Sequence, residues 1–252
     1  MKRFEIIYED ESIVVINKPA GLLTVEDRYD KSLPDLTGLL HNKYENVMTV
    51  HRLDKDTSGV ILFAKDPEAH RSLNEQFQER KPKKIYHAVV DGIFPENEMD
   101  IDIPLMPNPG NKPGMIPSAR GKKSLTKVKV LERFKNATLL ECKLITGRHH
   151  QLRAHVSAVG HPLLVDPLYG KSKGFYLSSV KRHYNLGREK EERPIISRIS
   201  MHSRKLTVIH PKKHEEISFE AEYPKDFAVL LKQLRKWAPV PKYMEEDEDF
   251  FT

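Results

Sequence analysis

The sequence predicts an α+β fold, with a mixed, largely antiparallel central sheet and flanking helices and loops. Short β-prone runs joined by tight polar turns recur along the 252 residues, whereas amphipathic helical stretches are few. Neighbouring strands form hairpins and do not alternate with helices, which argues against a doubly wound parallel sheet. We expect one large domain at residues 1–240 and an acidic tail at 241–252.

The first third of the chain predicts a hairpin, two short helices and a polar turn between strands. Asp35 is a suitable N-cap for a helix at 36–44, and Asp66 followed by Pro67 for a helix ending near Arg80. The predicted strands are 4–8, 12–17, 47–50 and 60–64. The polar turn at 51–59 therefore separates two apolar strands.

The remaining chain predicts further hairpins and two helices. Residues 101–124, rich in Pro and Gly, indicate an extended basic surface loop. Residues 171–197 are basic with little apolar periodicity and indicate an insertion. The predicted strands are 85–92, 125–134, 137–145, 205–209 and 216–221, and the predicted helices are 148–159, ended by Gly160, and 226–237.

Charge and cysteine content narrow the function classes. The formal net charge is +6, and removing the five negative charges of residues 245–249 leaves +11 for the rest of the chain. A body this basic favours a polyanionic partner such as nucleic acid. A single cysteine, Cys142, excludes a disulfide framework and fits a reducing compartment. Without a signal peptide or a membrane-length apolar run, we expect a cytoplasmic protein that binds no membrane.

The turn His51-Arg52-Leu53-Asp54-Lys55-Asp56-Thr57-Ser58-Gly59 is the first place to look for chemistry. Charged side chains between core strands cost free energy unless they are paired or used. An EF-hand loop starting at Asp54 lacks its twelfth-position glutamate, since Lys65 stands there, and its flanks are strands. A kinase catalytic loop would need a Gly-rich loop and an Asp-Phe-Gly motif. A capping role for Asp54 is the simpler structural alternative.

The histidines at 149, 150, 155 and 161 raise the possibility of a metal site. None lies four residues from another on a helix with an accompanying glutamate, and the only cysteine lies in a strand. We therefore predict no metal.

The turn also resembles the catalytic motif of the RluA family of RNA pseudouridine synthases. Four further segments resemble that family in the same order along the chain, so the resemblance covers about residues 5–230. These segments are Asn17-Lys18-Pro19-Ala20-Gly21, Lys84-Ile85-Tyr86-His87-Ala88, residues 147–170 beginning Gly147-Arg148-His149-His150-Gln151-Leu152-Arg153, and Met201-His202-Ser203 with His210-Pro211.

The resemblance implies the isomerisation of uridine to pseudouridine in structured RNA, without a cofactor. It assigns the catalytic aspartate to Asp54, the active-site tyrosine to Tyr86 and the basic partner of the aspartate to Arg153. Arg52 matches the residue that fills the space left by a flipped-out base. Whether Asp54 attacks C1′, attacks C6 or removes a C2′ proton is left open, as is the choice between rRNA and tRNA.

Substrate binding is expected from a second group of residues. Leu152 is expected in the apolar floor of the pocket, with Arg148, Gln151, Lys122 and Lys123 toward the RNA. The basic loop and the 171–197 insertion are expected to hold phosphates.

We expect a monomer without an obligate protein partner and without an S4-type RNA-binding domain. The alternative function is an RNA-binding or RNA-folding protein in which catalysis is secondary. A third class, a small-molecule hydrolase that uses Asp54, is disfavoured because we find no phosphate-cradling loop and predict no metal site.

Overall fold

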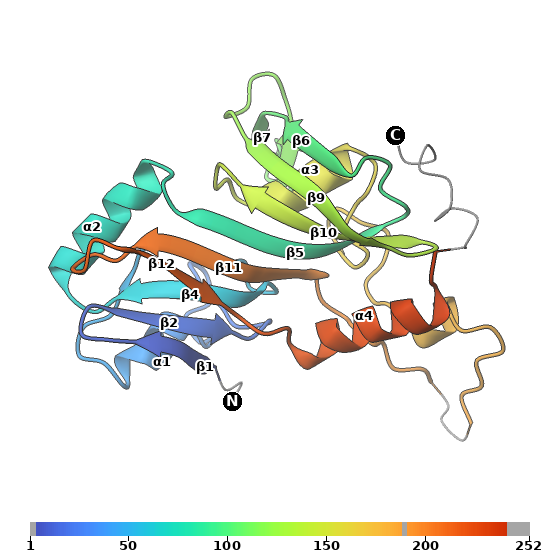
Figure 1. The fold of residues 1–252 in the computed structure, drawn as a ribbon, viewed down its shortest axis with the longest axis horizontal. Helices are drawn as coiled ribbons and strands as arrows, with labels where there is room; N and C mark the ends of the chain where they lie inside the picture. The colour runs from blue at the N-terminus through green and yellow to red at the C-terminus, as the bar shows by residue number, and fades with distance from the viewer. Residues whose placement is uncertain (1–3, 188–190, 241–252) are drawn as a thin grey trace. The chain divides into compact units, whose positions relative to one another are not determined.

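Two units make up the structure, a computed structural model that describes residues 4–187 and 191–240 (Figure 1). Among the described residues, unit 1 combines 4–86 with 202–223, and unit 2 combines 87–187 and 191–201 with 224–240. Unit 2 thus interrupts unit 1 in the sequence. The predicted acidic tail lies outside the described residues, and the predicted domain limits stay predictions.

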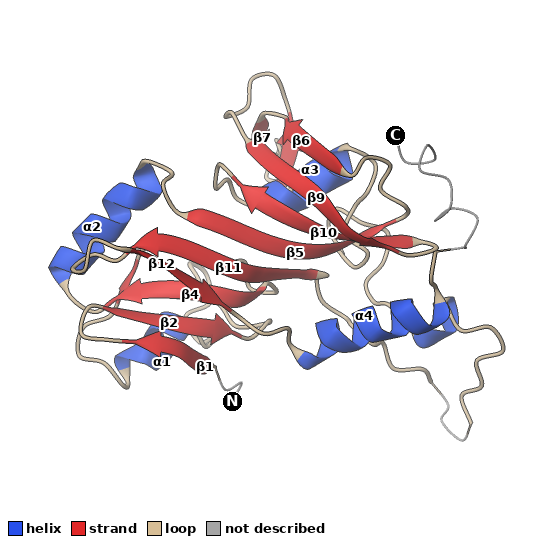
Figure 2. Ribbon diagram, in the orientation of Figure 1, coloured by secondary structure: helices blue, strands red, loops and turns tan. Residues whose placement is uncertain are grey.

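Unit 1 contains a mixed sheet of short strands, shown in red in Figure 2. The strand order is β1-β2-β4-β11, with β3 pairing with β4 and β12 with β11. Strands β4 and β11 pair in parallel, whereas the pairs β1–β2, β2–β4, β3–β4 and β11–β12 are antiparallel. The strands are β1 (Glu5–Glu9), β2 (Ile13–Lys18), β3 (Met48–Thr49), β4 (Ser58–Ala64), β11 (Met201–Ile209) and β12 (Glu216–Glu220). All seven residues of β4 are buried, so this strand forms the centre of the unit.

Both predicted helices of unit 1 begin where their caps indicate. Asp35 accepts a hydrogen bond from the Gly38 amide at the start of α1 (Leu36–His41), and Asp66 accepts one from Ala69 at the start of α2 (Pro67–Gln78). Leu73 of α2 is fully buried in an apolar cluster with residues of β2, β4, β11 and β12. The cluster fixes α2 against the sheet that carries the polar turn.

Unit 2 has its own antiparallel strands, in the order β5-β10-β9-β6. They are β5 (Lys83–Asp91), whose first residues belong to unit 1, β6 (Glu98–Asp102), β9 (Leu125–Arg133) and β10 (Ala137–Leu144). The predicted hairpin of β9 and β10 is confirmed by their register, from Thr138 opposite Arg133 to Leu144 opposite Thr126. The prediction of a mixed, largely antiparallel α+β fold is confirmed.

The prediction of an extended loop at 101–124 is wrong in part. Strand β6 reaches Asp102, and a separate two-stranded sheet pairs β7 (Leu105–Pro107) with β8 (Met115–Pro117). Leu105 and Lys122 also exchange backbone hydrogen bonds of 3.1 and 2.9 Å. The prolines stand at the ends of these short strands, where a missing N–H is tolerated. Proline content therefore led to the prediction of a loop where residues 105–107 and 115–117 form paired strands.

Two longer helices and one turn of 3₁₀ helix complete unit 2. The helix α3 (Gln151–Ala158) begins three residues later than predicted, because His150 has a left-handed φ of 50° that is incompatible with a helical turn there. In α4 (Lys225–Trp237) the predicted face of Phe227, Leu230, Leu231 and Leu234 is buried. The 171–197 segment contains the 3₁₀ turn at Leu177–Ser179. No helix in residues 4–187 or 191–240 is both long and apolar enough to cross a bilayer.

Candidate active site

Asp54 opens a tight turn that leads into β4. The Thr57 amide donates to the Asp54 carbonyl at 3.1 Å, which closes the turn. Leu53 is buried, and its backbone N–H and C=O bond the Thr24 hydroxyl at 3.2 and 2.9 Å. Asp54 is half-buried and Arg52 is exposed. The turn thus anchors its apolar residue and presents the two polar side chains on either side of it.

A buried ammonium group holds the other side of this turn. Lys18 is fully buried, and its Nζ donates to the carbonyls of Leu22, Lys55 and Pro19 at 2.7, 3.0 and 3.2 Å. A lysine ammonium has three donors, and each has an acceptor here. The Gly21 amide adds a 2.8 Å bond to the Lys55 carbonyl. The segment 17–21 therefore supports the Asp54 turn by binding its backbone.

Gly59 ends the turn because β11 passes too close for any side chain. Its φ is +113°, and a Cβ there would lie 2.1 Å from the Ser203 carbonyl oxygen. Ser58 and His202 are joined on the parallel strands by an Oγ–Nδ1 hydrogen bond of 2.9 Å. The Met201-His202-Ser203 segment thus fixes the strand that follows Asp54.

His51 serves the turn as an anchor. Its ring stacks on Phe77 of α2 at 4.8 Å, and its Nε2 accepts a hydrogen bond from the Leu62 amide at 3.0 Å. Desolvation lowers the pKa of His51 to about 3, with the positive charge of Lys84 adding to the effect. A neutral ring is what an accepting nitrogen requires.

Tyr86, near the start of β5, is buried at 8% exposure in the same unit as Asp54. Burial raises its pKa above the ordinary range, the Asp54 charge raises it further, and a hydrogen bond with Ser203 opposes both. The phenol therefore stays protonated at neutral pH and lies within electrostatic reach of the Asp54 carboxylate.

Arg153 lies in unit 2, on α3, in a bidentate pair with Asp166. Its Nε and Nη2 donate to the two carboxylate oxygens at 2.7 and 2.9 Å, and its guanidinium carbon lies 5.0 Å from the centre of the Tyr169 ring. Asp166 is fully buried. Burial raises the pKa of its carboxyl, but the hydrogen bonds and charge of Arg153 and the amides of Leu168 and Tyr169 outweigh that effect and lower it.

Asp166 lies in the 147–170 segment of the family resemblance, which assigns it no role. The structure gives it one, since it fixes the orientation of the Arg153 guanidinium. A chemical argument could have predicted this pair. A buried arginine on α3 needs a carboxylate beside it, and Asp166 lies in the loop that follows the helix.

Gln151, the first residue of α3, is 2% exposed, and its side-chain amide forms hydrogen bonds with four nearby residues. Its Oε1 accepts from the Thr146 hydroxyl at 2.6 Å and from the Arg148 amide at 3.0 Å, while its Nε2 donates to Leu125 and Thr126. These bonds join the start of α3 to β9. Leu152 is 2% exposed beside it.

The basic residues predicted to contact RNA come together in unit 2. Lys122 and Lys123 are exposed, and Arg148 is half-buried with its Nε and Nη2 each 3.3 Å from the Lys123 carbonyl oxygen. The contact ties the Arg148 side chain to the backbone of the segment that carries the two lysines.

The histidines considered for a metal site have protein partners. Both ring nitrogens of His155 form hydrogen bonds of 2.9 Å, with Thr126 and with the Ile103 carbonyl. The Nδ1 of His161 is 3.0 Å from the Asp91 carbonyl oxygen. His149 and His150 stack at 3.8 Å, and His150 Nδ1 is 3.3 Å from the Tyr169 hydroxyl. His155 has no ring nitrogen left for a ligand.

Comparison with known proteins identifies the chain's relatives. The profile described as RNA pseudouridylate synthase matches residues 12–158. A protein from Zymomonas mobilis named Ribosomal large subunit pseudouridine synthase D is 37% identical over 243 residues, which are 91% of this chain and 72% of that protein. Dual-specificity RNA pseudouridine synthase RluA from Pasteurella multocida is 37% identical over 219 residues, or 86% of this chain and 92% of that protein.

A solved structure extends the likeness to the fold. The structure titled Human RNA Pseudouridylate Synthase Domain Containing 4 has a TM-score of 0.69 and 28% identity, and the match covers 94% of each chain. The protein belongs to the RNA pseudouridylate synthase family and is an RNA pseudouridine synthase, an isomerase. The family and the fold predicted from the sequence are both confirmed.

Proposed function

We propose that this protein converts specific uridines of rRNA or tRNA to pseudouridine, with Asp54 as the catalytic carboxylate. The choice of RNA class rests on the names of its relatives, which refer to the large ribosomal subunit and to dual specificity. The C1′–N1 bond of the uridine breaks, and a C1′–C5 bond forms. The C5 proton is lost and N1 gains a proton, so no oxidant, reductant or net hydrolysis is needed.

The position of Asp54 carries the proposal. Its carboxylate is half-exposed on a turn whose backbone is fixed by Lys18 and Thr24. A fixed backbone lowers the entropic cost of aligning a carboxylate with a bound nucleotide. Partial exposure leaves room for the nucleotide to reach it.

Tyr86 and Arg52 have complementary roles toward the target base. Tyr86 keeps its proton, so its ring can stack on the uracil while its hydroxyl serves as a hydrogen-bond donor. Extruding a base from structured RNA costs a few kcal/mol. The exposed guanidinium of Arg52 offsets part of this cost by filling the space and stacking on neighbouring bases.

Unit 2 contributes charge and an apolar surface. Arg153, held by Asp166, supplies a preoriented cation for the catalytic carboxylate. Leu152 forms part of the apolar floor, and Gln151 positions the helix start through its internal hydrogen bonds. Arg148, Lys122 and Lys123 bind phosphates. We also propose a cytoplasmic monomer.

The decisive test is pseudouridine mapping of total RNA from cells with the gene, without it, and with Asp54→Asn. Pseudouridine should disappear at one or more sites in the last two strains, and conversion in vitro should fall at least about 10³-fold. Asp56→Asn is the matched control, because Asp56 is an exposed carboxylate of the same turn. It should leave the sites modified. If no site is lost on deletion, the proposal fails.

The alternative is an RNA-binding or RNA-folding role in which catalysis is secondary. A strain with Asp54→Asn separates the two, because a folding role survives loss of conversion. Unchanged ribosome assembly and tRNA function in that strain, with a defect only on deletion, would favour the alternative.

A further inference from the structure

Two adjoining hollows in unit 2 lie outside the residues assigned to catalysis. The first has a volume of about 390 Å³ and the second about 530 Å³. Asn136 and Ser179 line both, so the two hollows meet at these residues. Their walls come from the 171–197 segment, the turn between β9 and β10 and the end of α4.

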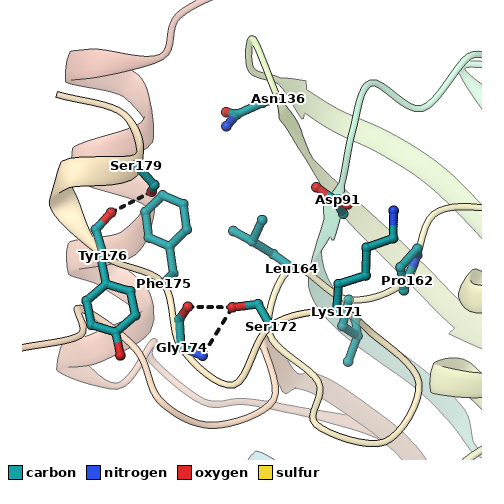
Figure 3. Close-up of a pocket in the computed structure, with 11 residues that line it drawn as sticks. Asp91, Asn136, Pro162, Leu164, Lys171, Ser172, Gly174, Phe175, Tyr176 and Ser179 are labelled. Carbon is teal, nitrogen blue, oxygen red and sulfur yellow. Dashed lines mark hydrogen bonds between the residues drawn. The ribbon is translucent and has the colours of Figure 1, made fainter. Parts of the chain in front are cut away.

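The first hollow combines an apolar floor with polar groups. In Figure 3, Phe175, Tyr176 and Ser179 line one side, Asp91 and Lys171 the other, and Leu164 lies between them. Phe175 is 6% exposed and Tyr176 is 40% exposed, so one ring closes the floor and the other is available to a ligand. Asn136 and Asp91 offer a hydrogen-bond donor and acceptors. A flat ring with a polar edge is what this lining suits.

Hydrogen bonds within the protein hold the lining of the first hollow. The Phe175 amide donates to the Ile196 carbonyl at 2.9 Å, and the Ile195 amide donates to the Phe175 carbonyl at 2.7 Å. The Ser172 hydroxyl bonds the Gly174 carbonyl and receives the Gly174 amide, as the dashed lines in Figure 3 show. The Asp166 amide also bonds the Ser172 carbonyl at 3.1 Å. These contacts tie the segment to the loop that orients Arg153.

The second hollow is cationic and aromatic. Lys135, Arg182 and Trp237 line it. Two further ammonium groups approach the Trp237 ring, from Lys181 at 5.0 Å and from Lys236 at 4.9 Å. The one acid in either lining is Asp91, and the nearby Glu192 carboxylate accepts from the Ser178 amide at 2.9 Å. The charge of the second hollow therefore favours phosphate groups.

We propose that these two hollows bind an unpaired nucleotide of the substrate RNA and the phosphates beside it. The base lies in the first hollow against Tyr176, with its edge toward Asn136 and Asp91, and the flanking phosphates lie over Lys135 and Arg182. The inference rests on the proposed function, because the RNA that occupies the hollows is the RNA being modified. Aromatic rings interleaved with cations suit single-stranded RNA better than duplex, whose bases are already stacked.

The test measures binding of a fluorescein-labelled single-stranded RNA of twelve random nucleotides, and of a duplex of the same length, to the full chain. Tyr176→Ala should weaken single-strand binding about fivefold or more, and Tyr176→Phe should restore it. Lys135→Ala with Arg182→Ala should lower the salt slope of binding by about 1.4, for two phosphate contacts. Lys225→Ala with Lys232→Ala is the matched control, since both lysines are exposed on α4 outside the hollows.

The outcomes separate this inference from the proposed function. Wild-type affinity and salt slope in Tyr176→Ala and in Lys135→Ala/Arg182→Ala overturn the inference, and retained conversion by the same preparations leaves the proposed function standing. A cytidine or uridine monophosphate that competes at micromolar concentration also overturns it, because the site then serves a free nucleotide. In a third outcome the variants bind RNA more weakly, but the wild-type protein forms no pseudouridine. This outcome supports RNA binding in the hollows and overturns the proposed function.

Discussion

The turn that carries Asp54 and the segment that carries Arg153, which is α3 with the loop that contains Asp166, are held by different kinds of contact. The second is called the Arg153 segment below. Around Asp54 the side chains of Lys18 and Thr24 bind backbone groups, so the turn is positioned independently of its own polar side chains. Around Arg153 one functional side chain is bound directly by another, Asp166. The first arrangement leaves its carboxylate half-exposed, whereas the second buries both charges. The two segments should therefore respond differently to substitution and to pH.

The largest expected effect is the loss of stability when the ion pair between Arg153 and Asp166 is broken. Asp166→Ala leaves the buried guanidinium of Arg153 without its counter-charge, which should reduce the free energy of unfolding by about 3–5 kcal/mol. Urea denaturation measures this. Asp100→Ala is the control, because Asp100 pairs with Lys127 at 2.7 Å on the surface and should cost under about 1 kcal/mol. Equal losses in the two variants would contradict the comparison.

A smaller loss is expected where a side chain binds backbone. Lys18→Met removes the ammonium donor from three carbonyl groups, of which only that of Lys55 keeps the bond described from the Gly21 amide, and we expect about 2–3 kcal/mol lower stability. Conversion should fall in kcat while RNA affinity is retained, because the turn loosens but its surface persists. Lys55→Met makes the same change on an exposed side chain and should alter stability by under about 0.5 kcal/mol. A Lys18→Met enzyme with wild-type kcat would show that the hydrogen bonds of Lys18 do not position Asp54.

Acid should loosen the Arg153 segment before the Asp54 turn. The pKa of Asp166 is lowered on folding, so its stabilising contribution is complete above the unfolded value of about 3.9 and is lost as the pH falls through the lower folded value. The Lys18 ammonium group donates its hydrogen bonds to backbone carbonyl groups, which do not titrate. Hydrogen exchange should therefore show the Leu168 and Tyr169 amides losing protection in acid while the Gly21 amide keeps it. Simultaneous loss of protection would indicate global unfolding and refute the difference.

The smallest expected effect is at a buried hydroxyl of the turn. Within the described part of the chain the Thr57 hydroxyl has no hydrogen-bond partner, so Thr57→Val should change stability by under about 0.5 kcal/mol or increase it. Thr24→Val removes a hydroxyl that bonds both backbone groups of Leu53 and should cost about 1–2 kcal/mol. Thermal melts of the two variants give the comparison. A larger loss in Thr57→Val would mean that its hydroxyl has a role outside these contacts.

Sequence reasoning succeeded where the information was contiguous. The strands around residues 51–59, the N-caps Asp35 and Asp66 and the apolar face of α4 all depend on neighbours within a few positions. The Lys18 and Asp166 contacts were not predicted, because they join residues that only the folded chain brings together. Lys18 reaches a carbonyl 37 positions away, and Asp166 pairs with a residue 13 positions away.

Residue type was a poor guide to exposure near α3. Gln151 was expected to contact RNA because it is polar, yet it is buried by hydrogen bonds to β9 and to the residues before the helix. The run closed by Gly160 predicted the α3 helix, but it could not reveal the left-handed residue that delays its start. In residues 101–124 proline suggested a loop, whereas the pairing of two short strands within that segment decided the structure.

The close approach of Gly59 to Ser203 has a consequence for protein synthesis. The strand β4 pairs with β2 as soon as residue 64 is made, but its parallel partner β11 begins more than 130 residues later. Until then the Ser58–Gly59 end of β4 lacks its parallel partner, and an unpaired edge on a strand this rich in apolar residues is a template for aggregation. Completion of the strand pair that supports Asp54 therefore waits until β11 is made, so chains truncated before residue 201 should be inactive and prone to aggregate.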